Sequence, residues 1–416
     1  MNLINQYKGL PKQVYIICTA RIITAMGSFV FSFTTLLVTG ILGMSAIAAA
    51  YMNIVFSAAS VCGALFFGRL ADRHDRKKVL LFIMGLNIIN LIVGGFIVYN
   101  KAVLVCICMV SFCFSGFIPV LAAMISDITT ESNRKESFSL LYLCINIGYS
   151  MGQVIAGTLF YNYTRWIFWG QALAFIFGAS VIFFCLKGLP DLSEIRYARA
   201  LEVVESDGHK NQGMGQFFKV LSLDKVLLIF LAAAVLIQYT HSEIFYLLPL
   251  QLTDVAGLEA SSKWISYMWF TNGVCCIVMT PILLHLTKGF TQITNLAIAA
   301  LAYAVGLGGL FFVQKPSAIW MILPFAFIWT AGEVIVNTGT GVFIADRAKP
   351  EFRASYQSLY SFAGDFGRCL GPVTMGYLLQ VISYGQGWLA TSGVSLTAVA
   401  ILLVCRNLHK KELVEK

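Results

Sequence analysis

The stretch of sequence that decides the fold is GRLADRHDRKK, residues 68–78. It is a short, strongly basic segment between two long apolar runs, of which one ends near Phe67 and the next begins at Val79. Lys and Arg in short loops between membrane-spanning helices stay on the cytoplasmic side. The segment therefore predicts a cytoplasmic loop between two spans and fixes the orientation of both.

The composition of the whole chain is that of a membrane protein. Of its 416 residues, 58% are hydrophobic and 12% are charged, whereas a soluble domain carries roughly 25% charged residues. A helix that crosses a bilayer needs about 20 mostly apolar residues. We therefore predict an all-α integral membrane protein with twelve transmembrane helices, at about residues 14–40, 45–68, 79–98, 103–126, 137–162, 165–187, 225–252, 263–286, 292–313, 317–345, 355–382 and 386–406.

The net charge of +9 follows the distribution that membrane proteins show. With the N-terminus in the cytoplasm, 23 of the 29 Lys and Arg residues fall on cytoplasmic segments and two fall within spans. Four fall outside: Lys101, Arg165, Lys263 and Lys315. A nucleic-acid-binding protein would instead gather its basic residues on one face. The pattern predicts a multi-pass protein of the cell membrane, in contact with the lipid bilayer and not with nucleic acid, with both termini cytoplasmic.

The two halves of the chain are copies of one another. Residues 125–159 align with residues 344–378 at a constant offset, and ten of the 35 positions are identical. Apolar composition alone would not align the charged and Gly residues, which are the pairs Asp127/Asp346, Arg134/Arg353, Gly148/Gly367, Gly152/Gly371 and Gly157/Gly376. We therefore predict two pseudo-symmetric six-helix bundles, residues 1–187 and 225–416, joined by a cytoplasmic linker at 188–224.

The basic segment resembles a signature of the major facilitator superfamily of transporters, Gly-x-Leu-Ala-Asp-Arg-x-Gly-Arg-Lys, which lies between the second and third helices. This chain has Asp75 where the family usually has Gly, and matches the signature at Gly68, Leu70, Ala71, Asp72, Arg73, Arg76 and Lys77. With the spans, the repeat and the linker, the resemblance covers nearly the whole chain. It implies a monomeric secondary transporter that works by alternating access, with its small-molecule substrate near the middle of the bilayer.

The resemblance also implies a cytoplasmic gate made of charged residues. In the family, Asp72 would accept hydrogen bonds from neighbouring helix ends, while Arg73 and Arg76 would pair across the cytoplasmic face. Such pairs would hold the outward-open state and break when the protein opens inward. The alternative is that these residues serve topology alone. The predicted gate comprises Gly68, Asp72, Arg73, Arg76, Asp127, Arg134, Asp346 and Arg353.

Three ionisable residues within the predicted spans are candidates for proton coupling, because a charge at the bilayer centre costs roughly 2.5–3.5 kcal/mol on insertion scales. Glu333 lies near the midplane of the tenth span, in a Gly-Glu pair that resembles the drug:proton antiporters of the superfamily. The alternative is a buried acid that Asn337 or a helix terminus satisfies. Asp365 and Arg368 are three residues apart on one helix face, where they can pair. That pair is either a proton switch or a permanent structural contact.

Further polar and aromatic residues of the spans are predicted to line a substrate cavity, in which the aromatic rings would suit lipophilic cations. Arg21 either faces this cavity or extends toward the cytoplasmic interface. Glu243 lies either on the cavity wall or at a hydrated end of the seventh span. The predicted lining comprises Arg21, Asn146, Tyr149, Gln238, Tyr239, Glu243, Tyr246, Trp269, Trp329 and Asn337.

These residues leave two transport functions open. The first is proton-coupled export of lipophilic or drug-like molecules, as in the antiporters that the chain resembles. The second is uptake of an anionic or polar metabolite, such as a sugar, a peptide or an organic acid, by proton symport or by uniport. It remains open because Gln153 replaces the Pro of the antiporters' fifth-helix signature. The sequence has no metal-ligand spacing, nucleophile elbow or phosphate loop, so we expect neither an enzyme nor a cofactor.

Overall fold

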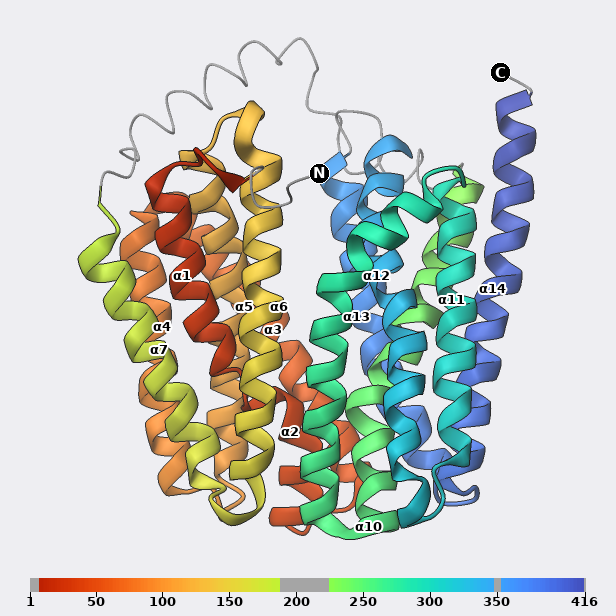
Figure 1. The fold of residues 1–416 in the computed structure, drawn as a ribbon, viewed down its shortest axis with the longest axis horizontal. Helices are drawn as coiled ribbons and strands as arrows, with labels where there is room; N and C mark the ends of the chain where they lie inside the picture. Colours follow the sequence, from red (N-terminus) through yellow and green to blue (C-terminus); the bar gives the residue numbers. More distant parts are fainter. Residues whose placement is uncertain (1–6, 188–223, 348–352, 415–416) are drawn as a thin grey trace. The chain divides into compact units, whose positions relative to one another are not determined.

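The computed structural model describes residues 7–187, 224–347 and 353–414. Within these ranges the regular structure is helical throughout and contains no strand (Figure 1). The all-α fold predicted from the apolar runs is therefore confirmed. The predicted linker at 188–224 lies outside the described residues, apart from Asp224.

The first of two compact units comprises Met1–Met44, Met52–Ser206 and Ile265–Gly273. Within this unit α1 packs against α6 and α7, and α4 packs against α5 and α7. Its helices are α1 (Lys12–Met26), α2 (Val30–Leu36), the π-helical η2 (Leu37–Ile41), most of α3 (Ala46–Arg73), α4 (Arg76–Phe96), α5 (Val103–Ile128), α6 (Glu131–Asn162) and α7 (Arg165–Cys185).

The second unit comprises Ser45–Tyr51, Asp207–Trp264 and Val274–Lys416. Within it α11 packs against both α12 and α14. Its helices are most of α10 (Lys225–Thr287), α11 (Gln292–Gly308), the 3-10 helices η3 (Gly309–Phe312) and η4 (Pro316–Met321), α12 (Ile322–Arg347), α13 (Arg353–Leu378) and α14 (Tyr384–Val414). The units follow the two halves of the chain, except that the start of α3 belongs to the second unit and a part of α10 to the first.

Helix α10 contains two of the predicted spans. Its 63 residues would extend roughly 95 Å at 1.5 Å per residue, about three times the thickness of the hydrocarbon core of a bilayer. Gly257 interrupts the helix with φ 81° and ψ 168°, a backbone conformation that only Gly adopts readily. The runs predicted at 225–252 and 263–286 therefore form separate crossings on either side of this kink.

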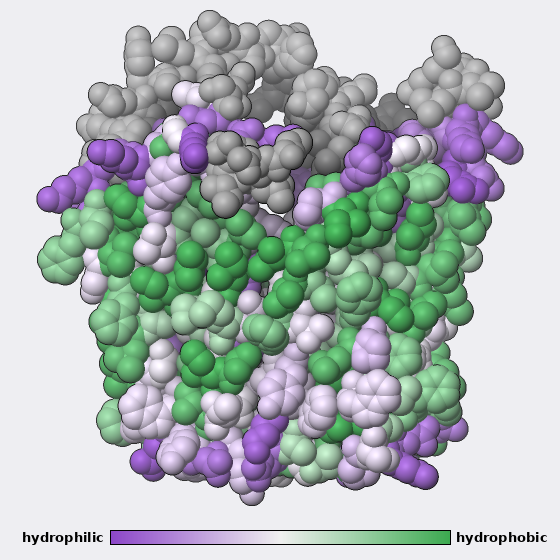
Figure 2. All heavy atoms as spheres, in the orientation of Figure 1, coloured by the Kyte–Doolittle hydropathy of each residue, from purple (hydrophilic) through white to green (hydrophobic). Residues whose placement is uncertain are grey.

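Ten helices of the described chain are long and apolar enough to cross a membrane, and α10 is one of them. The run predicted at 355–382 forms α13, which is 26 residues long but does not belong to these ten because it carries several polar and charged residues. Figure 2 shows apolar residues along the middle of the helices and hydrophilic residues at their ends. The multi-pass membrane fold is thus confirmed.

Helix α4 illustrates how the sequence divides a span between protein and lipid. Ile83 and Leu91 are fully buried, whereas Phe82, Ile89 and Phe96 are more than half exposed. A soluble protein rarely exposes so many large apolar side chains in one area, but lipid chains solvate them. The exposed face of α4 is therefore its lipid-facing surface.

The residue that departs from the family signature begins α4. Asp75 is the N-cap residue, and its Oδ1 accepts a hydrogen bond of 2.8 Å from the backbone N–H of Lys78. An Asp at this position accepts a hydrogen bond from one of the free N–H groups of the first helical turn. Its negative charge also interacts favourably with the positive end of the helix dipole. The substitution therefore strengthens the helix start that follows the basic loop.

The duplicated Gly residues allow equivalent close approaches in the two units. In the first unit a Cβ atom on Gly152 of α6 would lie 2.9 Å from Cα of Met26 in α1. In the second unit a Cβ on Gly371 of α13 would lie 2.9 Å from the carbonyl oxygen of Tyr239 in α10. Both distances are too short for a side chain, so each Gly lets two helix backbones touch. The internal repeat thus preserves, in both units, a Gly at which two helices pack closely.

Candidate functional site

Helices α10 and α13 bring together a polar group in the second unit. Arg368 Nη2 lies 2.5 Å from Asp365 Oδ1, and Arg368 Nη1 donates a 2.8 Å hydrogen bond to Gln238 Oε1 of α10. The ion pair expected from the spacing of three residues is therefore present. The Asp365 and Arg368 side chains are 39% and 46% exposed, so this pair remains accessible to a proton or a ligand.

A second titratable pair joins α10 to α12. His241 Nε2 lies 3.9 Å from Glu333 Oε1, and the two side chains are 19% and 18% exposed. This separation is too long for a hydrogen bond, but it is close enough for a strong electrostatic interaction if His241 is protonated. The His241 ring also lies 6.0 Å from that of Tyr303 and 6.4 Å from that of Trp329. Glu333 is therefore held beside a titratable group, among aromatic rings.

Other predicted lining residues of the second unit have different surroundings. Trp329, Tyr239 and Tyr246 are almost completely buried, whereas Asn337 is exposed. The Tyr239 hydroxyl forms a 2.8 Å hydrogen bond with Thr374 of α13. These three aromatic side chains therefore pack between helices rather than along an open surface.

Glu243 lies on α10 and is completely buried. Among the described residues, neither of its carboxyl oxygens has a hydrogen-bond partner. Tyr239 and Tyr246 lie within electrostatic range of it on the same helix. It is more enclosed than Glu333 and Asp365, the two acidic residues predicted for proton coupling.

The second unit also has a small recess beside the Arg368 group. Gln238, the hydrogen-bond acceptor of Arg368, lies in the wall of this recess. The other lining side chains are largely apolar and include Phe230, Ile237, Leu296, Val336 and Tyr360.

In the first unit, Arg21 is buried with 5% of its surface exposed. Its guanidinium carbon lies 5.3 Å from the centre of the Phe117 ring and 5.8 Å from that of Phe114, both on α5. Arg21 Nη1 donates a weak hydrogen bond of 3.4 Å to Thr24 Oγ1. Aromatic faces stabilise a desolvated guanidinium by cation–π attraction. Arg21 therefore does not extend to a surface but points into its own bundle.

Tyr149 of α6 contacts a polar and an aromatic side chain in the first unit. Its hydroxyl lies 2.7 Å from Ser32 Oγ of α2, and its ring meets the Trp269 ring edge-on at 5.9 Å. Asn146, one turn earlier, donates a 2.9 Å hydrogen bond to the carbonyl oxygen of Tyr142 in its own helix. Trp269 is buried and Tyr149 is partly exposed, so the unit contains an aromatic cluster with one polar edge.

Two of the residues predicted for the cytoplasmic gate pair with each other within the first unit. Arg76, at the start of α4, makes an ion pair with Asp127 of α5 and donates a 2.8 Å hydrogen bond to the carbonyl oxygen of Ala123. Arg134 donates to the carbonyl oxygen of Thr129 at 3.2 Å. Arg76 and Asp127 are both nearly buried, so their pair ties α4 to α5.

The other predicted gate residues contribute less to the described geometry. Arg73 is exposed, and a Cβ on Gly68 would meet no atom within 4 Å. The side chains of Asp72, Asp346 and Arg353 lie outside the described residues. Their gating role stays a prediction.

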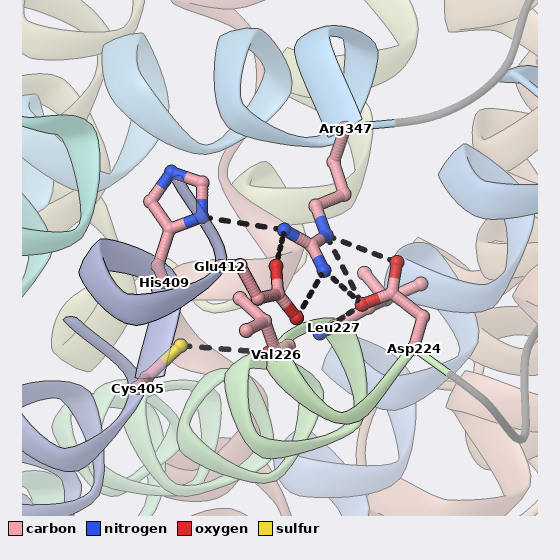
Figure 3. A network of polar contacts seen from close by, with 7 residues as sticks. All are labelled: Asp224, Val226, Leu227, Arg347, Cys405, His409 and Glu412. Carbon is pink, nitrogen blue, oxygen red and sulfur yellow. Dashed lines mark hydrogen bonds and ion pairs between the residues drawn. The ribbon is translucent and has the colours of Figure 1, made fainter. Parts of the chain in front are cut away.

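The most extensive charged network of the described residues lies at the end of the second unit (Figure 3) and was not predicted from the sequence. Arg347 of α12 lies 2.6 Å from Asp224 and 2.8 Å from Glu412 of α14, and its Nη1 lies 3.3 Å from His409 Nδ1. Burial lowers the pKa of Arg347, but the hydrogen bonds that Arg347 donates to both carboxylates outweigh burial and leave this pKa above its usual value. The sequence carried one signal for part of this network: Asp224 stands directly before an apolar run, which is typical of a helix start.

The described residues contain no group of three or more His, Cys, Asp or Glu side chains that could hold a metal ion. The ionisable groups within the spans are instead arranged as pairs, or enclosed singly. Ionisable residues of this kind, inside a two-unit helical membrane protein, are typical of the ion and substrate pathways of transporters. The fold and the site together thus define a membrane transporter.

The sequence profile of the Major Facilitator Superfamily matches residues 17–372. Because this match covers most of the chain, the protein belongs to the Major Facilitator Superfamily and is a transporter, not an enzyme. The family predicted from the basic loop is therefore confirmed.

Relatives of similar length match nearly the whole chain. The uncharacterized MFS-type transporter YqjV of Bacillus subtilis (strain 168) is 24% identical over 393 residues, which cover 91% of this chain and 90% of the relative. The uncharacterized MFS-type transporter YdeE of Escherichia coli (strain K12) is 23% identical, with 87% and 86% covered. A Na(+), Li(+), K(+)/H(+) antiporter of Planococcus maritimus is 20% identical, with 82% of each chain covered.

Solved structures of transporters share the fold. The nucleoside transporter NupG superimposes with a TM-score of 0.75 at 13% identity, covering 95% of this chain and 99% of its own. An auto-inhibited POT family peptide transporter gives a TM-score of 0.75 at 14% identity, with 95% and 97% covered. At such low identity, these matches establish the architecture and not the substrate.

Proposed function

We propose that this transporter is a proton-coupled antiporter that exports lipophilic or drug-like small molecules. The observation that carries the proposal is the presence of two titratable pairs in the second unit, His241 with Glu333 and Asp365 with Arg368. Transporters use such intramembrane groups as proton relays. Similarity to a relative named as a cation/proton antiporter supports exchange against protons.

Asp365 has the contacts that a proton switch requires. When its carboxylate binds a proton, its attraction for Arg368 falls, because the ion pair is replaced by a hydrogen bond from the guanidinium to a neutral carboxyl group. Arg368 would then keep its 2.8 Å hydrogen bond to Gln238. Protonation would thus loosen the guanidinium from Asp365 while it stays bound to α10. A change of this kind in the wall of the recess would couple proton binding to cargo release.

The aromatic cluster of the first unit supports an apolar cargo. Tyr149 is partly exposed and offers a ring and a hydroxyl bound to Ser32, and the buried Trp269 ring lies against it. Aromatic faces bind lipophilic cations through both apolar contact and cation–π attraction.

One observation favours a second candidate function, the uptake of an anionic metabolite. Arg21 is a buried cation whose described contacts are two Phe rings and one weak hydrogen bond to Thr24. Its guanidinium has donors left for a carboxylate or a phosphate, which it binds through two parallel hydrogen bonds. An Arg21→Lys variant should weaken anion transport and leave cation transport unchanged.

The test is a proton-release assay in everted membrane vesicles. The vesicles are acidified inside, and a lumenal pH dye is followed while lipophilic cations or anionic metabolites are added. We expect a cation to dissipate the gradient in wild type but not in Glu333→Gln or Asp365→Asn. Glu259→Gln is the matched control, since Glu259 forms only a half-exposed pair with Lys263. A response to anions alone, lost in Arg21→Lys, would overturn the export proposal in favour of uptake.

A further inference from the structure

Glu243 is an acidic side chain of the second unit that the proposed proton switch does not use. It is completely buried on α10, and neither carboxyl oxygen has a hydrogen-bond partner in the described part of the chain. The nearby hydroxyl of Ser242 does not serve it, because it donates to the carbonyl oxygen of Tyr239 at 2.7 Å. A buried carboxylate without a cation or a donor is strongly disfavoured relative to its neutral acid form. The surroundings therefore suit a protonated carboxyl.

The backbone of α13 covers this carboxyl directly. A Cβ on Gly371 would meet Ser242 Oγ first and would lie 2.9 Å from Glu243 Oε1, so any larger residue at this position would collide with both side chains. One turn earlier, a Cβ on Gly367 would lie 3.1 Å from the backbone nitrogen of Tyr239. The two Gly residues let α13 lie flat on α10, and we call this contact the α10–α13 seam. Water can reach Glu243 on this side only if the seam opens.

The charged groups of the neighbouring helices are engaged elsewhere. From α13, Arg368 is bound to Asp365 and to Gln238. From α12, Glu333 faces His241, the other titratable residue of this part of α10. No ion pair of Glu243 occurs among the described residues, so no nearby cation stabilises its ionised form.

The hydroxyl groups around Glu243 are engaged as well. The Tyr239 hydroxyl binds Thr374 of α13 at 2.8 Å. The Tyr246 hydroxyl donates to the carbonyl oxygen of Ala46 at 2.8 Å, and Tyr384 of α14 acts electrostatically on Tyr246. In this conformation these groups do not stabilise an ionised Glu243.

We propose that Glu243 is a proton-binding site of the transport cycle, which holds a proton while the α10–α13 seam is closed and releases it to water when the seam opens at Gly371. The carboxylate gains one proton on loading and returns it on release, so no other reactant is needed. This inference rests on the proposed function in that it assigns a further coupling site to the same proton-driven cycle. It adds a requirement that Asp365 and Glu333 lack, namely that proton exchange needs a helix movement.

The proton on Glu243 can be observed without any substrate. We would record infrared spectra of the full-length protein in lipid nanodiscs at neutral pH and follow the carbonyl stretch of protonated carboxyl groups. Wild type should show such a band, Glu243→Gln should lose it, and Glu259→Gln should keep it. Gln has the shape of a protonated Glu, so Glu243→Gln should fold and give the size-exclusion profile of wild type. A wild-type spectrum that matches that of Glu243→Gln would overturn the proposal.

A second variant tests the seam. Gly371→Ala places a methyl group against Glu243 and Tyr239, so α13 must move away from α10. In deuterium oxide, the band of wild type should shift slowly, because its proton is enclosed, and that of Gly371→Ala should shift faster. Equal exchange rates in both proteins would contradict the role of the seam.

Transport measurements separate this inference from the proposed function. If the band depends on Glu243 but no cargo is exchanged for protons, the proton site stands and the antiport proposal fails. If antiport is present and Glu243→Gln performs it at the wild-type rate with unchanged proton release, the antiport proposal stands and Glu243 is not a coupling site. Loss of proton-coupled transport in Glu243→Gln, with cargo still moving down its own gradient, supports both.

Discussion

Replacing Arg347 with Met is expected to loosen the end of the second unit at which α12 ends and α10 begins. Arg347 lies 2.6 Å from Asp224 and 2.8 Å from Glu412, and so ties α12 to the start of α10 and to α14. Met keeps the aliphatic stem but has no donor. The substitution leaves the Asp224 side chain, which is 13% exposed, without its cation, whereas Glu412 is 36% exposed and regains water.

The magnitude follows from this difference in burial. Loss of one partner from a buried ion pair costs about 3–5 kcal/mol, but an exposed pair contributes only about 0–1 kcal/mol. Asp224 keeps its 2.9 Å hydrogen bond from the Leu227 backbone, which favours the lower end of the range. We expect a loss of about 3 kcal/mol, or a decrease in Tm of about 6–12 °C for a unit of this size.

The assay is thermal unfolding in lipid nanodiscs, organised as two double-mutant cycles. One cycle combines Arg347→Met with Asp224→Asn, and the other combines it with Glu412→Gln. The coupling energy with Asp224 should be about 2 kcal/mol or more, and that with Glu412 should remain below about 1 kcal/mol. Equal coupling energies, or an unchanged Tm in Arg347→Met, would refute the reasoning from burial.

Three further substitutions test the packing and the caps. Asp75→Ala should lower the stability of the first unit by about 1 kcal/mol through loss of the α4 cap, measured as a lower Tm that Asp75→Ser largely restores. Gly152→Leu should abolish the folded peak in size-exclusion chromatography, because its side chain meets the Met26 backbone, whereas Gly85→Leu, with no atom within 4 Å of its Cβ, should keep it. Asp127→Ala should lower the free energy of unfolding by about 3 kcal/mol, and Tm with it, because Arg76 is then buried without its carboxylate partner. An unchanged Tm would show that this ion pair does not stabilise the protein.

The fold was largely predictable because it depends on patterns that the sequence displays openly. The basic segment at 68–78, the lengths of the apolar runs and the aligned Gly residues are all local or periodic signals. The kink at Gly257 was foreseen only as a break between two runs, since a single Gly does not reveal that the flanking helices continue to its edges. Helix α13 was predicted as an apolar run at 355–382, and the repeat of residues 125–159 at 344–378 supported it.

The site was predictable only where partners are close in sequence. Asp365 and Arg368 are three residues apart, so helix geometry alone predicts their contact. His241 and Glu333 come from different helices, and their proximity depends on how α10 packs against α12, which no local pattern encodes. The enclosure of Glu243 depends in turn on the absence of a side chain at Gly371. Such contacts follow from tertiary packing and need the structure.

The most direct test of proton-driven transport is cargo accumulation by the purified protein in sealed liposomes. A lipophilic cation that gave a response in vesicles would be offered outside, with the lumen made acidic and no other gradient present. We predict uptake above equilibrium that stops when a proton ionophore collapses the gradient and that is absent in Asp365→Asn. Accumulation that persists with the ionophore, or mere equilibration whatever the gradient, would contradict the account.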